Sequence, residues 1–423
     1  MREELLQYIW RNRLFTNLPL YSTQGEKILI IRAGTYNTNA GPDFLEAHIK
    51  IGKQLWVGQV EIHVKASDWY KHQHQTNEAY QNVILHVVLE EDILIQNQKG
   101  VQIPCLELKK HIPKHFLGKY QRLLQKEHWI ACQSFLPQVP NERTQMWLDR
   151  LVIERMEQKT NQILERLQTN KENWETSLYQ VLAYSFGLSI NAEPFEALAK
   201  SLPLLLLAKH RNNLLQLEAL CFGQASLLEQ EFEEEYPKKL KREYQFLRAK
   251  YQLEPIAIPW RFLRLRPANF PSLRLAQFAA FFFKTHHLFS KILAASSVME
   301  LENMFNVQVS MYWKTHYQLD KPAPKRKKKL GVQTRRIIIM NAFIPFLFAY
   351  AKRRALPQYQ EKALHFLESM PAEQNAVITR FKQIGLTVQT AYESQALLQL
   401  KKHYCNKQKC LECAIGYEIL KRN

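Results

Sequence analysis

Residues 82–89 read Asn-Val-Ile-Leu-His-Val-Val-Leu and are apolar at nearly every position. A strand that is apolar on both faces is typical of the middle of a sheet that is covered on both sides. His86 interrupts the run, and a buried imidazole needs a hydrogen-bond partner or a ligand. The segment therefore predicts the central strand of a covered sheet and marks His86 as a residue of interest.

The sequence on either side of this strand completes a sheet region over residues 1–115. Alternation of apolar and polar residues predicts further strands, and an amphipathic helix precedes them. The elements expected here are a helix at 3–13, strands at 27–32, 44–51, 55–65 and 82–89, a short helix at 76–81, and a closing hairpin of 93–95 with 101–108.

From about residue 140 the pattern changes to the spacing of amphipathic helices. The expected helices are 143–168, 172–187, 192–208, 212–230, 237–252, 272–294, 297–306, 335–355, 357–369, 372–384 and 392–404. The predicted fold class is therefore α+β. An N-terminal mixed sheet with flanking helices occupies 1–115, and a larger, mostly helical domain at 140–423 ends in a cysteine cluster.

Composition narrows the class of protein and of partner. The 423-residue chain carries 58 Lys and Arg against 39 Asp and Glu, a formal net charge of +19. Such an excess attracts polyanions, so nucleic acid is the expected partner, while protein partners and oligomeric state stay open. The N-terminus lacks the apolar core of a signal peptide, and the longest apolar stretch, 337–351, is too short to span a bilayer. Six cysteines are too few for a disulfide scaffold, so we expect a cytoplasmic protein that does not enter the membrane.

Two acidic residues are expected to meet where the second and third strands pair. Asp43 precedes the second strand, and Glu61, His63 and Lys65 alternate along the third. Alternate residues of a strand share a face, so these three project to one side. In an antiparallel pair Asp43 and Glu61 converge, which gives an oxygen-rich site for Mg²⁺ or Mn²⁺. Such a metal activates water for phosphodiester hydrolysis, and His63 or Lys65 would assist.

The histidines near this motif leave three interpretations open. His86 is either a satisfied core histidine or a ligand that lies beside Glu61 and His63. In a further interpretation, four histidines and a carboxylate form a transition-metal site. The histidines are His63, His72, His74 and His86. Two histidines so close in a polar loop, such as His72 and His74, are more commonly solvated.

The segment from Pro42-Asp43 to Glu61-x-His63, with Lys65 beyond, resembles the PD-(D/E)xK nuclease core. This resemblance covers roughly the first quarter of the chain. It implies a helix, three antiparallel strands, a helix and a further strand, and it implies metal-dependent nuclease activity. The position that is usually Lys is His63 here, so either His63 replaces that lysine or Lys65 reaches in from the same face.

The whole chain also resembles an uncharacterised bacterial family of similar length, defined by a domain of unknown function. The matching segments are 41–44 (Gly-Pro-Asp-Phe), 60–63 (Val-Glu-Ile-His), 67–69 (Ser-Asp-Trp), 85–88 (Leu-His-Val-Val), 221–225 (Cys-Phe-Gly-Gln-Ala), 266–271 (Arg-Pro-Ala-Asn-Phe-Pro) and the terminal cysteine run. This resemblance implies no established activity.

Three of the six cysteines lie near the C-terminus, as Cys405, Cys410 and Cys413. The Cys-x-x-Cys spacing lets two thiolates hold one metal and Cys405 can supply a third, so the pattern predicts a zinc or iron–sulfur site. A group of reduced thiols near a helix end is the alternative. The fourth ligand stays open among His403, Cys105, Cys132 and Cys221.

One segment of the helical region is strongly basic. It is suited to salt-dependent, sequence-independent contacts with several phosphates, although a charge run is also typical of a solvated loop. The cationic residues are Lys325, Arg326, Lys327, Lys328, Lys329, Arg335 and Arg336.

Together these patterns predict a metal-dependent nuclease whose basic helical region binds nucleic acid. One alternative is a catalytically inactive nucleic-acid-binding module, and the other is a protein-interaction module with a structural metal site. The sequence has no glycine-rich phosphate loop, which disfavours an ATPase, and no Gly-x-Ser-x-Gly elbow.

Overall fold

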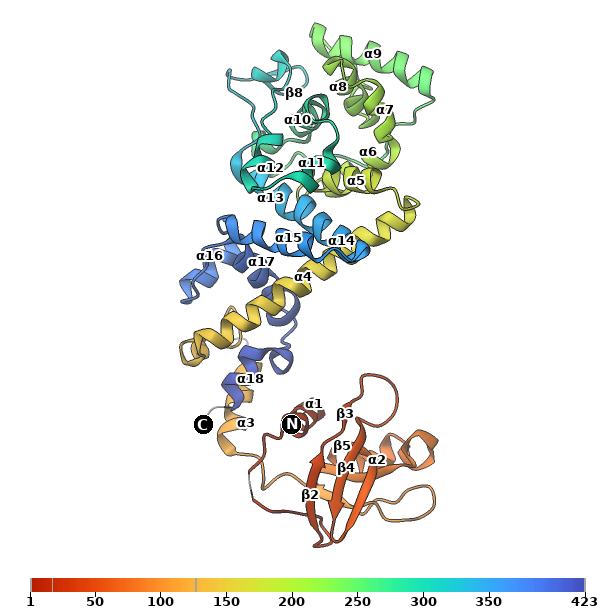
Figure 1. The fold of residues 1–423 in the computed structure, drawn as a ribbon, viewed down its shortest axis with the longest axis vertical. Helices are drawn as coiled ribbons and strands as arrows, with labels where there is room; N and C mark the ends of the chain where they lie inside the picture. The colour runs from red at the N-terminus through yellow and green to blue at the C-terminus, as the bar shows by residue number, and fades with distance from the viewer. Residues whose placement is uncertain (1, 17, 126–127, 422–423) are drawn as a thin grey trace. The chain divides into compact units, whose positions relative to one another are not determined.

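The computed structural model describes residues 2–16, 18–125 and 128–421. Two compact units are present: unit 1 comprises Met1–Trp147 and Lys401–Asn423, and unit 2 comprises Leu148–Leu400. The predicted ranges, 1–115 and 140–423, differ from this division because the C-terminal residues join the unit that contains the sheet. The α+β class is confirmed, with a mixed sheet in the N-terminal part and helices in most of the remainder (Figure 1).

Unit 1 is built on a mixed sheet with strand order β1-β2-β4-β5-β6-β7, and β3 pairs with β4. The pairings from β1 to β5 are antiparallel, whereas β5, β6 and β7 run parallel to one another. The strands are β1 Leu20–Tyr21, β2 Lys27–Arg32, β3 Thr35–Tyr36, β4 Phe44–Ile51, β5 Gln54–Lys65, β6 Val83–Glu90 and β7 Cys105–Glu107.

Strand β6 is the central strand that its apolar pattern predicts. Its first six residues are buried, and it is paired along both edges, with β5 and β7. The predicted hairpin of 93–95 with 101–108 forms in part: Gln96 and Gln102 make an antiparallel bridge, and the backbone N–H of Ile103 donates to Ile95 O over 3.2 Å. The following residues pair parallel to β6 instead, since this free edge lets the apolar Cys105 and Leu106 become fully buried.

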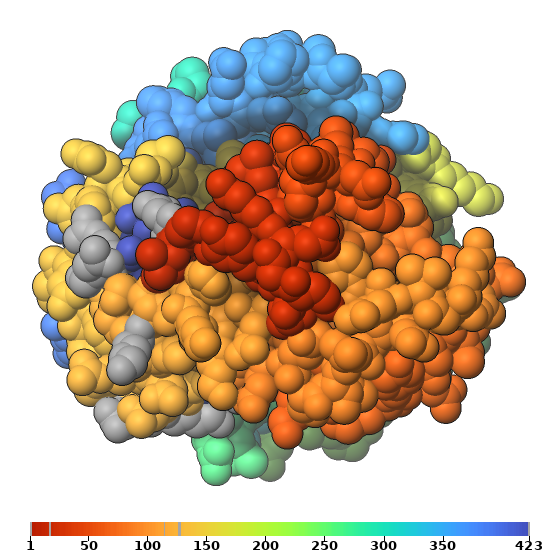
Figure 2. Space-filling model, turned by 90° about the horizontal axis from the view of Figure 1, so that it is seen from below, coloured from red at the N-terminus to blue at the C-terminus, as the bar shows by residue number. Residues whose placement is uncertain are grey.

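Helix α1 (Glu3–Asn12) packs on β5, and its predicted apolar face is buried. Figure 2 shows the start of the chain, in red, lying against the orange segments of the sheet region. The remaining helical segments of unit 1 are α2 Asp68–Lys71, η1 His74–Thr76, η2 Glu78–Tyr80, α3 Lys114–Leu124, η3 Gln133–Gln138, the π-helix η7 Leu400–Cys405, η8 Cys410–Glu412 and α18 Ala414–Lys421. The short helix expected at 76–81 is present only as the 3-10 turn η2, and two further short turns, α2 and η1, precede it.

Unit 2 is helical apart from one two-stranded ribbon, β8 (His316–Gln318) with β9 (Lys321–Pro322). Helix α4 (Asn141–Thr169) runs into it from unit 1. The other helices are α5 Trp174–Phe186, α6 Ala192–Ser201, α7 Leu204–Lys209, α8 Leu214–Gln224, α9 Glu235–Tyr251, η4 Pro267–Asn269, α10 Pro271–Lys284, α11 Leu288–Ala294, α12 Val298–Met304, η5 Met311–Lys314, α13 Val332–Ile338, the π-helix η6 Ile339–Phe343, α14 Ile344–Arg354, α15 Pro357–Ser369, α16 Ala376–Gln383 and α17 Ala391–Gln399.

Two predicted helices of unit 2 are divided. The segment 192–208 breaks before α7 because Pro203 cannot continue α6. The segment 272–294 breaks between α10 and α11, where His287 adopts a left-handed conformation with φ 52°. Each of these two predicted helices is therefore replaced by two shorter ones.

The apolar segment 337–351 lies within a longer helical stretch, Val332–Arg354, of 23 residues. This stretch is long and apolar enough to cross a membrane, so the expectation that it is too short is wrong. The helix continues past Pro345 because the π-helical turn η6 precedes it and accommodates the missing N–H. Of its most apolar window, 61% is buried inside the protein, which fits a core helix of a soluble protein.

Candidate metal centre

Strands β4 and β5 bring two carboxylates together. Phe44 pairs with Val60 in the antiparallel register, so Asp43 lies beside Glu61. The backbone N–H of Asp43 donates to Glu61 Oε2 over 3.0 Å, and the N–H of Ile62 donates to Asp43 Oδ2 over 3.1 Å. Each carboxylate is therefore fixed by the backbone of the other strand.

Helix α1 adds a third support to this pair. Gln7 Nε2 donates to Asp43 Oδ1 over 2.8 Å, and the Tyr36 hydroxyl donates to Gln7 Oε1 over 3.3 Å. Glu3 lies one helical turn before Gln7, and its carboxylate is 3.4 Å from Gln7 Nε2. The sequence analysis did not identify Gln7 or Glu3, although their spacing of four residues, which places both on one face of the helix, is a usable signal.

Burial makes these acids hold their protons unusually tightly. It raises the pKa of Asp43 to about 7, with the neighbouring Glu61 charge as the next cause. It raises the pKa of Glu61 to about 8, and the Glu3 charge contributes, while the hydrogen bond from the Asp43 N–H opposes the shift. Clustered acids with raised pKa values are typical of sites that receive a cation.

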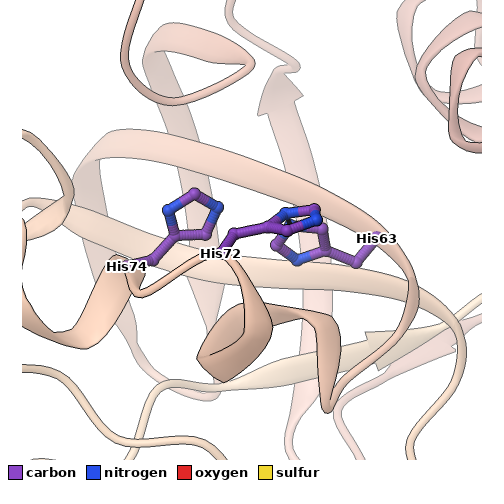
Figure 3. Close-up of side chains that lie close together, drawn as sticks. All are labelled: His63, His72 and His74. Atoms are coloured by element: carbon purple, nitrogen blue, oxygen red, sulfur yellow. Dashed lines mark hydrogen bonds between the residues drawn. The ribbon is translucent and has the colours of Figure 1, made fainter.

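Three imidazoles, those of His63, His72 and His74, lie close together (Figure 3), and two of them also lie near Glu61. The ligand atoms of His63, His72 and His74 all lie within 4.8 Å of one another. His63 Nε2 is 3.2 Å from His72 Nδ1, and Glu61 Oε1 is 3.3 Å from His74 Nε2 and 3.6 Å from His63 Nε2. His63 and His74 are buried, whereas His72 is exposed. The cluster therefore joins a buried carboxylate to an imidazole that solvent can reach.

The short turns after β5 return the histidines to the sheet. Gln73 has φ 60°, a left-handed conformation that reverses the chain between α2 and η1. Trp69 contacts the His74 ring edge-on at 5.3 Å, and Tyr80 stacks on His74 with ring centroids 3.8 Å apart. The sequence analysis considered both His72 and His74 to be solvated. In the structure His72 is exposed, whereas His74 is packed in a turn.

Both ring nitrogens of His74 lack a hydrogen-bond partner among the described residues, although the ring is buried. Its Nε2 is close to Glu61 Oε1, but the contact does not have hydrogen-bond geometry. A buried imidazole without partners is costly, and a bound ion would satisfy it.

His86 lies behind this cluster and not in it. Its Nε2 is 2.8 Å from His63 Nδ1, so one of the two rings donates to the other. Burial lowers the pKa of His63 to about 2 and that of His86 to about 3. Both rings are therefore neutral, and neutral imidazole is the form that binds metals. His86 serves as the group that orients His63.

Lys65 is not brought to the acidic pair. Its side chain is exposed, its backbone N–H donates to Asp68 Oδ2 over 3.1 Å, and its charge acts on Asp92. The cysteines Cys405, Cys410 and Cys413 lie in η7, η8 and just before α18, also in unit 1.

The basic residues of unit 2 divide into exposed and engaged groups. Lys328 is buried, with Nζ 3.0 Å from the centroid of the Tyr317 ring. Arg335 Nε donates to Leu330 O over 2.8 Å, and Arg336 pairs with Glu302 at 2.7 Å. The exposed ones are Lys325, Arg326, Lys327 and Lys329.

Comparison with known proteins gives one match. A family model described as "Protein of unknown function (DUF2851)" matches residues 3–376. No curated protein and no solved structure matches the chain.

Proposed function

We propose that this chain, which belongs to the DUF2851 family of proteins of unknown function, is a metal-dependent nuclease that hydrolyses phosphodiester bonds in nucleic acid. One observation carries the proposal: Glu61 lies between Asp43 on one side and the cluster of His63, His72 and His74 on the other. The order of α1, the antiparallel β2, β4 and β5, the short helices and then β6 also agrees with the order that the PD-(D/E)xK resemblance implies.

The donor set of the site fits a borderline transition metal. Imidazole nitrogens suit Mn²⁺ and Zn²⁺ better than Mg²⁺, which prefers oxygen ligands alone. His63, His72 and His74 would hold the ion together with Glu61, and the unpartnered nitrogens of His74 support this set. When bound, such an ion would polarise the phosphodiester and activate water.

The protein residues have distinct tasks in this proposal. Gln7 and the Ile62 N–H orient Asp43, and His86 orients His63. His72 is the exposed member of the cluster, so a substrate arriving from solvent meets its imidazole first. Because Lys65 is exposed whereas His63 is buried beside Glu61, His63 is the residue proposed to take the place of the usual lysine.

Cleavage of nucleic acid tests the proposal. We expect the purified protein to cut DNA or RNA with Mn²⁺ or Zn²⁺, and His72→Ala to lower the rate at least about tenfold, the scale of losses around metal sites. His72 is exposed, so its removal leaves the core intact. His48→Ala is the matched control, since His48 lies on β4 outside the cluster, and it should keep full activity.

Equal activity of His72→Ala and the parent protein would contradict the assignment. Binding of nucleic acid without turnover at any metal concentration would favour the catalytically inactive module instead. A protein that neither cleaves nor binds nucleic acid would favour the protein-interaction module with a structural metal site.

The exposed cations of unit 2 are proposed to contact phosphates. Each neutralised phosphate contributes about −0.9 to the slope of log affinity against log salt. Replacing Lys325, Arg326, Lys327 and Lys329 by Ala should therefore make the slope shallower by up to about 4, measured by fluorescence anisotropy with a duplex of arbitrary sequence. Replacing the exposed Lys239 of α9 is the control and should change the slope by less than about 1. An unchanged slope in the fourfold variant would exclude this segment from the interface.

A cytoplasmic location is part of the same proposal. None of the six cysteines forms a disulfide, which is typical of a reducing compartment.

A further inference from the structure

Four of the six cysteines gather in unit 1, outside the histidine site. Cys132 lies just before η3, Cys405 ends the π-helix η7, Cys410 begins η8, and Cys413 directly precedes α18. Cys132 and Cys413 are buried, Cys405 and Cys410 are half-buried, and none forms a disulfide. About 270 residues of sequence separate the first of these cysteines from the other three.

Contacts around the cluster bring the two segments together. Lys401 Nζ donates to the backbone oxygen of Trp129 over 2.8 Å and lies 4.3 Å from the centroid of the Trp129 ring. Three residues after Trp129 comes Cys132, and one helical turn after Lys401 comes Cys405. Helix α18 packs against η3 and α3, and Lys119 Nζ donates to Ile419 O over 3.3 Å. Hydrogen bonds and packing contacts therefore hold the segment 119–138 against the segment 401–421, which carries the other three cysteines.

The segments that carry the cysteines lie together: η3, which follows Cys132, packs against α18, and the backbone N–H of Cys413 donates to the backbone oxygen of Cys410 over 3.3 Å. Burial raises the pKa of Cys132 well above its usual value, and the charges of Cys405, Cys413 and Cys410 add to the shift. Burial likewise raises the pKa of Cys405 to about 12, with Cys413 and Cys410 contributing. Thiols with a raised pKa are poor nucleophiles at neutral pH, which argues against a redox Cys-x-x-Cys pair.

The first turn of α18 is shaped around this cluster. The backbone N–H groups of Ile415 and Gly416 donate to the Cys413 sulfur and partly offset the effect of burial on its pKa. A Cβ at Gly416 would lie 2.0 Å from the backbone oxygen of Cys410, so only glycine allows η8 and α18 to approach so closely. N–H donors directed at a cysteine sulfur stabilise the thiolate that a metal requires.

We propose that Cys132, Cys405, Cys410 and Cys413 form a four-thiolate metal centre that fastens the C-terminal segment to the N-terminal part of unit 1. Sulfur ligands alone select Zn²⁺ or an iron–sulfur cluster, and both use four cysteines. Binding replaces four S–H bonds by four metal–sulfur bonds and releases four protons to solvent. The role is structural, because the centre closes a loop that contains the whole of unit 2. It does not depend on the function proposed for the histidine site.

Metal analysis of the full-length protein, purified without oxygen, tests this centre. We expect about one zinc per chain, or about four irons with visible charge-transfer absorption, and either result supports the site. Cys132→Ser should lose this metal as completely as Cys413→Ser does. Cys221→Ser should keep it, because Cys221 is equally buried but lies in α8 of unit 2. His72→Ala is analysed in parallel, so that metal at the histidine site is counted separately.

Thiol reactivity of the native parent protein decides the matter if a serine variant does not fold. Four thiols that are protected in the native protein should become reactive towards a thiol reagent when a chelator is added. The chelator should also lower the Tm of the protein. Protein that contains neither zinc nor iron beyond the histidine-site count, or Cys132→Ser protein that retains all of its metal, would overturn the proposal.

Discussion

Glu61→Gln is expected to abolish cleavage and, at the same time, to stabilise the metal-free protein. The glutamine keeps the shape of the side chain and still accepts the Asp43 N–H, but it cannot supply the anionic oxygen that lies 3.3 Å from His74 and 3.6 Å from His63. Loss of a carboxylate ligand from a metal site should lower the single-turnover rate at least about 100-fold.

The gain in stability follows from the burial of Glu61. Its pKa is raised to about 8 in the folded protein, so the folded state binds a proton more tightly than the unfolded state. This contribution to stability is complete at low pH and is lost as the pH rises towards 8. The neutral glutamine avoids the loss, so the Tm of the variant should exceed that of the parent protein at pH 8 by several degrees, measured by calorimetry with a chelator present.

Glu78→Gln is the matched control for both measurements. Glu78 lies in η2, near the cluster in sequence but exposed, so its replacement should change neither the rate nor the Tm. A Glu61→Gln variant that cleaves at the parent rate, or that melts at a lower temperature, would contradict this account of the site.

The parts of the fold that followed from sequence are those governed by local pattern. The apolar run of β6 and the alternation along β5 each predicted a strand where the structure has one. The hairpin after β6 is shorter than predicted, and the parallel pairing of β7 with β6 was missed because it depends on which sheet edge is free, which no local pattern records. The association of the C-terminal residues with unit 1 is likewise a long-range contact between distant segments.

The site was predictable to a similar extent. Period-two alternation and an antiparallel pair are enough to suggest that Asp43 and Glu61 meet. The orientation of His74 depends on a left-handed Gln73 and on stacking against Tyr80, and neither is visible in residue spacing. Gln7 reaches Asp43 from a helix 36 positions away in sequence, which is a tertiary contact that only the packing of α1 on β5 determines.

Glu218→Gln should remove a large pH dependence from the stability of unit 2. Glu218 is fully buried in α8, where the Tyr236 hydroxyl donates to Oε2 while Oε1 has no hydrogen-bond partner among the described residues. Burial is the main reason that its pKa rises from 4.5 to about 7, and hydrogen bonds only partly offset it.

The direction of the effect follows from proton binding. Between pH 4.5 and about 7 the folded state keeps a proton on Glu218 that the unfolded state has released, so the free energy of unfolding falls as the pH rises through this window. At about 1.4 kcal/mol per pKa unit, the total is about 3 kcal/mol. The uncharged glutamine of the variant has no such loss and still accepts from Tyr236. Urea unfolding at pH 4.5 and pH 8 should therefore show the variant gaining about 3 kcal/mol over the parent protein at the higher pH. Glu229→Gln, which changes an exposed acid just beyond the same helix, should follow the parent at both pH values, and a Glu218→Gln curve parallel to the parent would mean that this carboxyl titrates normally.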